Sequence, residues 1–165
     1  MYKIDITVVE EDLGVNFLMA KVFAKLHTLQ QKHTFAVSFK NHTKKGVGNV
    51  VSVVASEDVL AEMKVKRVLQ GLDEYLHISK PKIASDVTYF KRVNSDKGVE
   101  RLKRRCIKRK GVTHEVADEM YKDYKQKHCK SPYLIVDSSS TGQKFSLFVE
   151  PCADTGKYNN YGLCI

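Results

Sequence analysis

The sequence lacks the marks of several common protein classes. Its four cysteines stand singly, with neither a CxxC pair nor the spacing of a zinc site. No apolar run is long enough to span a bilayer, and the first residues lack the basic segment and apolar run of a signal peptide. These absences predict a reduced, cytoplasmic protein without a membrane partner.

Familiar catalytic motifs are absent as well. Gly46-Val47-Gly48 lacks the third glycine of a dinucleotide site, and His114-Glu115 is not followed by the second histidine of a zincin. The chain has no GxSxG elbow and no cluster of carboxylates suited to two metal ions. We therefore expect no metal site, no cofactor and no small-molecule ligand.

Positive charge is abundant and unevenly distributed. The 165 residues carry a net charge of +9, and 42% of them are hydrophobic, which is enough for a packed core. Residues 1–60 hold 7 basic and 6 acidic residues, whereas residues 61–165 hold 21 basic and 13 acidic residues. This balance points to a polyanionic partner that binds mainly the later part of the chain.

The stretch Glu100–Lys110, ERLKRRCIKRK, is the strongest local signal. At helical spacing it presents one broad basic face opposite its apolar residues: Arg101, Arg104, Arg105, Lys108 and Arg109. Ser95 or Asp96 can cap the start of this helix, and Gly111 can end it in a left-handed turn. Like charges at this density oppose helix formation unless a polyanion neutralises them. The stretch predicts a nucleic-acid contact; the alternative is a solvated basic face.

Hydrophobic periodicity predicts an α+β protein. The first part alternates strands and helices. In strand Tyr2–Val8 the residues Tyr2, Ile4, Ile6 and Val8 alternate with polar ones, which predicts one buried face. A helix over Gly14–Gln31 follows, and its apolar stripe consists of Val15, Leu18, Met19, Val22, Phe23 and Leu26. The polar loop Lys40–Asn49 joins strands Phe35–Phe39 and Val50–Ala55 as in a hairpin, and a second helix runs from Ser56 to Gln70-Gly71. Two segments compete for the fourth strand, Tyr75–Ile78 and Val87–Val93. This order is the ferredoxin-like βαββαβ unit, which we expect to occupy residues 1–93 as the first domain.

Residues 94–165 are expected to form a second, smaller α+β domain that binds RNA. It would contain the basic helix, a helix capped by Thr113 that extends to Tyr124, and strands Tyr133–Val136 and Phe145–Val149. The Ser/Thr/Gly run that joins these two strands belongs to the same domain.

Three features carry residue types suited to RNA chemistry. His27 lies near the C-terminal end of the first helix, where an imidazole suits proton transfer, although an isolated histidine at a core edge is usually structural. The run Ser138–Gln143, SSSTGQ, offers hydroxyls and a glycine to an anion, but such runs also form ordinary hairpin turns. Phe145 and Tyr161 are candidate stacking platforms for bases; most aromatics near strands are simply core.

Five stretches, taken in chain order, resemble the CRISPR repeat-cleaving endoribonuclease family of type I-F systems: Leu18–His27, Ala36–Phe39, Arg92–Lys110, Tyr133–Phe148 and Tyr161–Leu163. The SSTGQ-x-F segment and the arginine-rich helix are the most distinctive. The resemblance implies an enzyme that cuts precursor CRISPR RNA at the 3′ base of a repeat stem-loop without a metal ion. It further implies retention on the guide-RNA hairpin and assembly with other subunits of a type I-F surveillance complex.

The resemblance also implies roles for individual residues. His27 matches the family's catalytic histidine, Ser138 the serine that positions the 2′-hydroxyl, and Tyr161 a tyrosine near the histidine. Phe145 matches an aromatic that stacks at the foot of the hairpin. Arg92 and Asn94 match two side chains that read bases in the lower stem. Ser140, Thr141 and Gln143 belong to the Ser/Thr loop and are expected to bind RNA as well. The helix residues expected to enter the major groove are Arg101, Arg104, Arg105, Lys108 and Arg109.

The chain departs from the family pattern in a few places. Asn94 stands where the family commonly has Gln. Lys108 and Lys110 replace Arg or His, which keeps the charge and loses the bidentate geometry of Arg. The chain stops two residues after Leu163, so contacts from a longer tail are expected to be missing. We expect altered stem specificity and lower product affinity.

The implied reaction needs no metal because RNA carries its own nucleophile. We hypothesise that His27 deprotonates a 2′-hydroxyl oriented by Ser138, which leaves a 2′,3′-cyclic phosphate and a 5′-hydroxyl. One alternative is a non-catalytic RNA-hairpin-binding subunit of a guide-RNA ribonucleoprotein. Another is an RRM-type regulator, which is disfavoured because the sequence has no RNP1 motif.

Overall fold

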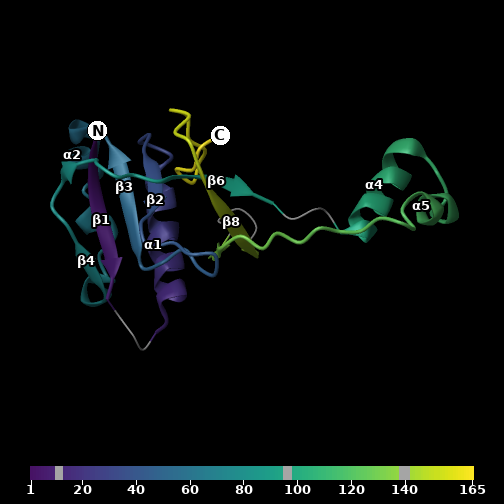
Figure 1. The fold of residues 1–165 in the computed structure, drawn as a ribbon, viewed down its shortest axis with the longest axis horizontal. Coiled ribbons are helices and arrows are strands. Elements are labelled where there is room, and N and C mark those ends of the chain that lie inside the picture. The colour runs from purple at the N-terminus through teal and green to yellow at the C-terminus, as the bar shows by residue number, and fades with distance from the viewer. Residues whose placement is uncertain (10–12, 95–97, 138–141) are drawn as a thin grey trace. The chain divides into compact units, whose positions relative to one another are not determined.

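The computed structural model describes residues 1–9, 13–94, 98–137 and 142–165. The chain forms two compact units, described here one at a time: Met1–Val93 together with Ser131–Ile165, and Asn94–Lys130 (Figure 1). The α+β class expected from the sequence is confirmed. Residues 131–165, which the sequence analysis assigned to the second domain, group with the first unit.

The first unit contains a five-stranded antiparallel sheet made of β1 (Tyr2–Val8), β2 (Ala36–Phe39), β3 (Val50–Ala55), β4 (Leu76–Ile78) and β5 (Lys82–Ile83). The strand order is β2-β3-β1-β4, and β5 pairs with β1. In the β1–β3 ladder Tyr2 lies opposite Ala55 and Thr7 opposite Val50. The predicted β2–β3 hairpin is confirmed.

Both candidates for the fourth strand form strands, but in different sheets. The first candidate is β4, which pairs with β1. The second, β6 (Tyr89–Val93), pairs with β8 (Lys144–Cys152), and β8 in turn pairs with β7 (Tyr133–Asp137). A three-stranded sheet of order β6-β8-β7 therefore joins β6, from the middle of the chain, to two strands that follow the second unit in sequence. This pairing explains why residues 131–165 belong to the first unit.

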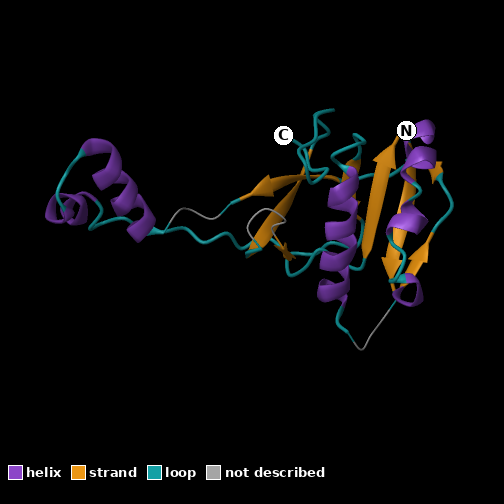
Figure 2. Cartoon of the chain, turned by 180° about the vertical axis from the view of Figure 1, so that it is seen from behind, coloured by secondary structure: helices purple, strands orange, loops and turns teal. Residues whose placement is uncertain are grey.

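Helix α1 (Val15–Leu29) covers one face of the first sheet, as Figure 2 shows. Its apolar stripe is buried as the periodicity predicted: Leu18, Met19, Val22, Phe23 and Leu26. From β1 the alternating residues Ile4, Ile6 and Val8 join the same core. The core thus fixes the rotation of α1 and with it the direction of side chains at the border of the stripe.

The predicted helix from Ser56 to Gly71 is wrong in its length. It is divided into α2 (Glu57–Met63) and α3 (Val65–Val68), followed by the short 3₁₀ helix η1 (Asp73–Tyr75). Lys64 lies between them with φ +45° and ψ +50°, the left-handed conformation that ends a helix. The break allows Met63 and Val65, on either side of it, both to be buried. Ser56 caps α2 as expected.

The face of the first sheet opposite α1 carries a cluster of polar side chains that contact residues 79–88. The Asp5 carboxylate lies 2.6 Å from the Lys82 ammonium and accepts a 2.6 Å hydrogen bond from the Ser52 hydroxyl. Lys3 donates to the carbonyl of Ser85, and Ser38 to that of Thr88. Burial raises the pKa of Asp5, but the hydrogen bonds from Lys82 and Ser52 and the positive charges of the two lysines outweigh it, so the pKa lies below its ordinary value of 3.8.

Lys82→Ala is expected to lower the free energy of unfolding by about 1–3 kcal/mol, because Asp5 stays buried without its nearest cation. Since the folded-state pKa of Asp5 is depressed, its contribution is present above pH 3.8 and is lost as the pH falls below that value towards the folded pKa. Urea unfolding from pH 7 to pH 3 measures both effects. Lys80→Ala, which removes a neighbouring exposed ammonium, is the control; an equal loss in both variants would contradict a specific ion pair.

The second unit consists of α4 (Val99–Lys110) and α5 (His114–Met120). Cys106 and Ala117 are buried between them, and the Lys103 ammonium lies 2.8 Å from the Asp118 carboxylate. Gly111 follows α4 with φ +65°, and the Thr113 hydroxyl caps α5. The third helix was expected to continue to Tyr124 but ends at Met120.

In the described part of the chain no helix is both long and apolar enough to cross a membrane.

Candidate active site

His27 stacks on Tyr161 in the first unit. Their ring centroids are 4.6 Å apart and their planes differ by 19°. The Tyr161 ring also stacks with the ring of Phe23, with the centroids 6.0 Å apart and the planes differing by 13°. Phe23 and His27 are four residues apart on α1, so they lie on one face of the helix, and both contact the tyrosine ring.

The ring of His27 has a defined hydrogen-bond partner. Its Nδ1 contacts the backbone carbonyl oxygen of Asn160. Because a carbonyl oxygen only accepts, Nδ1 carries the proton, and in the neutral imidazole Nε2 keeps its lone pair. The contact therefore selects the tautomer in which Nε2 can act as a base.

The tail that supplies Tyr161 and Asn160 is tied to the sheet by its backbone. The carbonyl of Gly162 accepts a 2.8 Å hydrogen bond from the N–H of Val37 on β2, and Leu163 is fully buried. The Asn159 side-chain oxygen accepts from the backbone N–H groups of Tyr161 and Leu163, at 2.8 and 3.2 Å. These contacts set the position of Tyr161 relative to α1.

Further along the tail, a tyrosine pair provides a second attachment. The rings of Tyr89 and Tyr158 stack at 6.3 Å, and the Tyr158 hydroxyl donates to Asp154 at 2.8 Å. Burial and the Asp154 carboxylate raise the pKa of Tyr158, so its hydroxyl stays protonated and remains a donor at neutral pH. The Cys164 N–H donates to the carbonyl of Phe90. The tail is thus fixed on both sides of Tyr161.

Arg92 and Phe145 extend the cluster. The Arg92 guanidinium carbon lies 5.5 Å from the centroid of the Phe145 ring and 6.0 Å from that of Tyr161. Phe145 meets Tyr161 edge to face at 6.2 Å. We call His27, Arg92, Phe145 and Tyr161 the histidine–arginine cluster. It brings together α1, β6, β8 and the tail, and it combines a base, a cation and aromatic surfaces.

The expected helix cations lie in the second unit. Arg101, Arg104, Lys108 and Arg109 are exposed, whereas Arg105 is half-buried. The side chain of Arg104 donates to the Glu100 carbonyl at 3.4 Å. Asn94 is exposed and begins this unit. With Cys106 buried, α4 presents four of the five expected contact cations to solvent.

Several predicted site residues lie outside the described residues: Ser138, Ser140 and Thr141, together with the expected helix caps Ser95 and Asp96. Gln143 is described and exposed at the far end of the Ser/Thr run. Within residues 1–9, 13–94, 98–137 and 142–165, no three His, Cys, Asp or Glu side chains gather as a metal-binding group.

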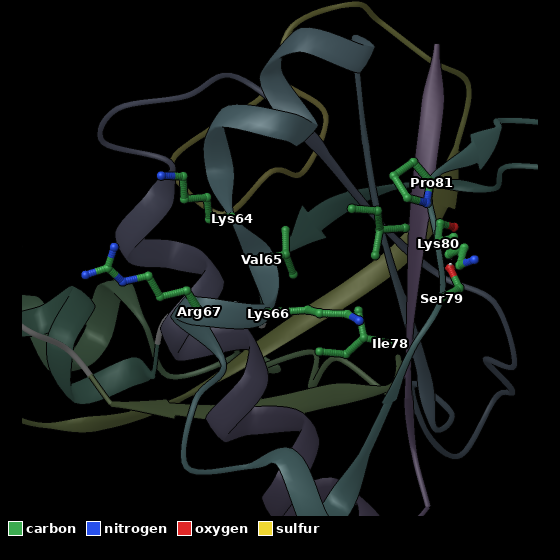
Figure 3. A pocket seen from close by; sticks show the side chains of 9 residues that line it. Lys64, Val65, Lys66, Arg67, Ile78, Ser79, Lys80 and Pro81 are labelled. Carbon is green, nitrogen blue, oxygen red and sulfur yellow. Dashed lines mark hydrogen bonds between the residues drawn. The ribbon is translucent and has the colours of Figure 1, made fainter.

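A groove of about 380 Å³ lies elsewhere in the first unit, between α3 and β4 (Figure 3). Ile4, Val65 and Ile78 are among its lining residues, and in Figure 3 the Lys66 side chain extends towards Ile78. None of the site residues expected from the sequence lines it, so it does not belong to the histidine–arginine cluster.

The sequence analysis missed two contributors to the site. Phe23 was recognised as a core residue of the apolar stripe, and its spacing of four from His27 was the available signal for a shared ring contact. Asn160 acts through its backbone carbonyl, which no side-chain pattern reveals.

Comparisons with known proteins identify a family and two relatives of this chain. Residues 3–165 match the family model Cas_Csy4, described as a CRISPR-associated protein. The chain is similar to the CRISPR-associated endonuclease Cas6/Csy4 of Pseudomonas aeruginosa (strain UCBPP-PA14), with 29% identity over 159 residues, 88% of this chain and 85% of the relative. It is also similar to the CRISPR-associated endonuclease Cas6/Csy4 of Escherichia coli (strain UTI89 / UPEC), with 26% identity over 167 residues, 93% of this chain and 89% of the relative.

Proposed function

Because the chain belongs to the Cas_Csy4 family of CRISPR-associated proteins, we propose that it is an endoribonuclease that processes CRISPR RNA. Its relatives are endonucleases by name. The observation that carries the proposal is the His27 ring, stacked on Tyr161 with Nδ1 bound to the Asn160 carbonyl, because this leaves Nε2 as a base. The substrate is the repeat stem-loop of precursor CRISPR RNA, cut at its 3′ base.

The reaction proceeds by attack of the RNA on itself. Nε2 of His27 takes the proton of the 2′-hydroxyl, which Ser138 orients, and the 2′-oxygen forms a bond to the adjacent phosphorus. The bond from phosphorus to the 5′-oxygen breaks, and that oxygen takes up a proton from solvent. The products are a 2′,3′-cyclic phosphate and a 5′-hydroxyl, and the RNA supplies the nucleophile, so the reaction requires no metal ion.

RNA binding uses two groups of residues. Near the cut, Phe145 stacks at the foot of the hairpin, Arg92 and Asn94 read the lower stem, and Ser140, Thr141 and Gln143 contact the backbone. The stacking of Arg92 on Phe145 supports this part, since it presents a cation beside an aromatic surface. The exposed cations of α4 enter the major groove of the stem; a hairpin of a few base pairs is open at its end.

The proposal extends to the domain architecture of the chain. We assign residues 1–93 to a ferredoxin-like domain that carries the catalytic histidine, a reading supported by the βαββαβ order and the β2-β3-β1-β4 sheet. Residues 94–165 supply the RNA-binding residues other than Arg92. The protein acts in the cytoplasm, stays bound to the guide-RNA hairpin after cutting, and joins other subunits of a type I-F surveillance complex.

Cleavage in the presence of excess EDTA tests the function. A labelled repeat hairpin is expected to be cut, and a substrate with a 2′-deoxy nucleotide directly 5′ of the cut is expected to remain intact. Intact RNA that is nevertheless tightly bound would favour the alternative, a non-catalytic hairpin-binding subunit of a guide-RNA ribonucleoprotein. Cleavage of the 2′-deoxy substrate would contradict the mechanism.

Arg104→Ala and Arg105→Ala are expected to weaken hairpin binding and to reduce the slope of log affinity against log salt by at most about one unit for each lost phosphate contact. Filter binding at several NaCl concentrations measures the slope. Arg67→Ala on α3 removes an exposed arginine of the first unit as the control. An unchanged salt slope in the α4 variants would identify that face as a solvated surface.

A further inference from the structure

A second groove, of about 360 Å³, lies in the first unit between α1 and β7. Ala20 and Ala24 line it from the helix, and Ile135 lines it from the strand. Because α1 packs against β7, the groove offers side chains rather than an open strand edge. It contains none of the residues assigned to RNA cleavage.

Large apolar side chains gather at this groove although they are exposed to solvent. Phe17 is 53% exposed, Tyr133 46% and Ile135 54%. Along β7 buried and exposed residues alternate, so Leu134 and Val136 fill the core while their neighbours face outwards. Single exposed apolar residues are ordinary, but a cluster around a groove marks a binding surface.

The rim of the groove is positively charged. Lys21, Lys45 and Lys144 line it, and the only carboxylate among the described lining residues is that of Asp137. The ammonium of Lys21 lies 5.4 Å from the centroid of the Phe17 ring. A ligand complementary to this surface combines aliphatic side chains with carboxylates.

These features favour a protein helix over RNA or a second copy of the chain. The Lys21 ammonium lies over the Phe17 ring, and the rings of Tyr133 and Phe148 pack with their centroids 5.1 Å apart. Neither Phe17 nor Tyr133 therefore offers a free ring face on which a base could stack. A symmetric dimer would place the three lysines of one copy against those of the other. Ala20 and Ala24, four residues apart, let a second helix approach α1 closely.

We propose that this groove binds an acidic amphipathic helix of another protein, with aliphatic side chains against Ile135 and the two alanines, and carboxylates beside the lysines. The mode is that of a helix in a groove. This inference names a surface and the chemistry of a protein partner, and it does not depend on RNA cleavage by the histidine–arginine cluster.

Three synthetic helical peptides test the proposal by fluorescence anisotropy with the full chain: one with Leu on one face and Glu on the flanks, one with Ser for Leu, and one with Lys for Glu. Only the Leu/Glu peptide is expected to bind well, and more weakly as NaCl is raised. Phe17→Ser with Ile135→Ser is expected to lower its affinity about tenfold or more, since both apolar contacts are lost.

Reversing the charge of the groove rim provides a complementary test. The triple change of Lys21, Lys45 and Lys144 to Glu is expected to weaken the Leu/Glu peptide and to strengthen the Leu/Lys peptide. Ile83→Ser, which removes an apolar side chain that is 72% exposed on β5, is the matched control and is expected to bind like the parent chain. Hairpin cleavage by the Phe17/Ile135 variant is expected to stay unchanged.

Several results would overturn the proposal. Failure of the Leu/Glu peptide to bind, equal binding of the Leu/Glu and Leu/Lys peptides, or equal affinity in the Phe17/Ile135 and Ile83 variants would each contradict it. Loss of affinity for a labelled single-stranded RNA in the Phe17/Ile135 variant, with peptide binding intact, would identify an RNA surface. Self-association that this variant abolishes in sedimentation would identify a second copy as the occupant.

Discussion

His27→Ala is expected to abolish RNA cutting and to leave hairpin affinity nearly unchanged. The change removes Nε2, the proposed base, and the loss of a positioned base lowers a rate typically by about 10²–10⁴. Binding depends on cations and stacking surfaces that the variant retains. Single-turnover cleavage of a labelled repeat hairpin in EDTA measures the rate, and filter binding measures the affinity.

His77→Ala is the matched control, because it removes an exposed imidazole from β4 in the same unit. It is expected to cut at the parent rate. Equal losses of cutting and binding in His27→Ala would instead indicate that His27 serves only to hold Tyr161 and the tail in place.

Gly162→Ala is expected to lower both stability and cleavage. Gly162 has φ +71°, and an added Cβ would lie 2.6 Å from Cγ2 of Val37 and 2.7 Å from Nε2 of Gln30. The tail must therefore move away from β2, which displaces Tyr161 from His27. A shift of about 1 Å at a reacting group can cost roughly 10² in rate. Thermal unfolding and the single-turnover assay measure the two effects.

Gly156→Ala separates the steric effect from backbone strain. Gly156 has φ +66°, but an added Cβ there would meet no atom within 4 Å. Both variants force alanine into a left-handed conformation, so the extra destabilisation of Gly162→Ala, about 1–3 kcal/mol, reports the overpacking against Val37 and Gln30. Equal unfolding temperatures and equal cleavage in the two variants would show that the close approach at Gly162 is unimportant.

Local pattern was sufficient for much of the fold. The alternation of Ile4, Ile6 and Val8 predicted β1 and its buried face, and the spacing of Leu18, Val22 and Leu26 predicted α1. Both elements bury one face against the same core, so the period of their apolar residues corresponds directly to their packing. The polar loop between β2 and β3 likewise predicted the hairpin.

Long-range packing decided what local pattern could not. Residues 57–68 favour a helix throughout, yet Lys64 adopts a left-handed conformation because Met63 and Val65 are both buried in the core. The two candidates for the fourth strand were indistinguishable by composition. Their partners, β1 for one and β8 for the other, are far away in sequence, and pairing with them divides the candidates between two sheets.

The candidate site, like the fold, was only partly predictable from local sequence pattern. The position of His27 alone was weak evidence for a catalytic role. Its proximity to Tyr161 was implied only by the family resemblance. The structure brings these two rings to 4.6 Å, with Arg92 and Phe145 beside them. The Asn160 carbonyl had no sequence signal because every residue carries one, and only the path of the backbone selects it.

The bond between His27 and the Asn160 carbonyl joins positions 133 residues apart. Contacts across such a separation close a long loop of chain, and their entropic cost is recovered only after the intervening sheets have formed. A partly folded chain with α1 and the first sheet in place would lack Tyr161 and the oriented imidazole. We therefore expect cutting activity to emerge in the last step of refolding, after far-ultraviolet circular dichroism has already reached its native value.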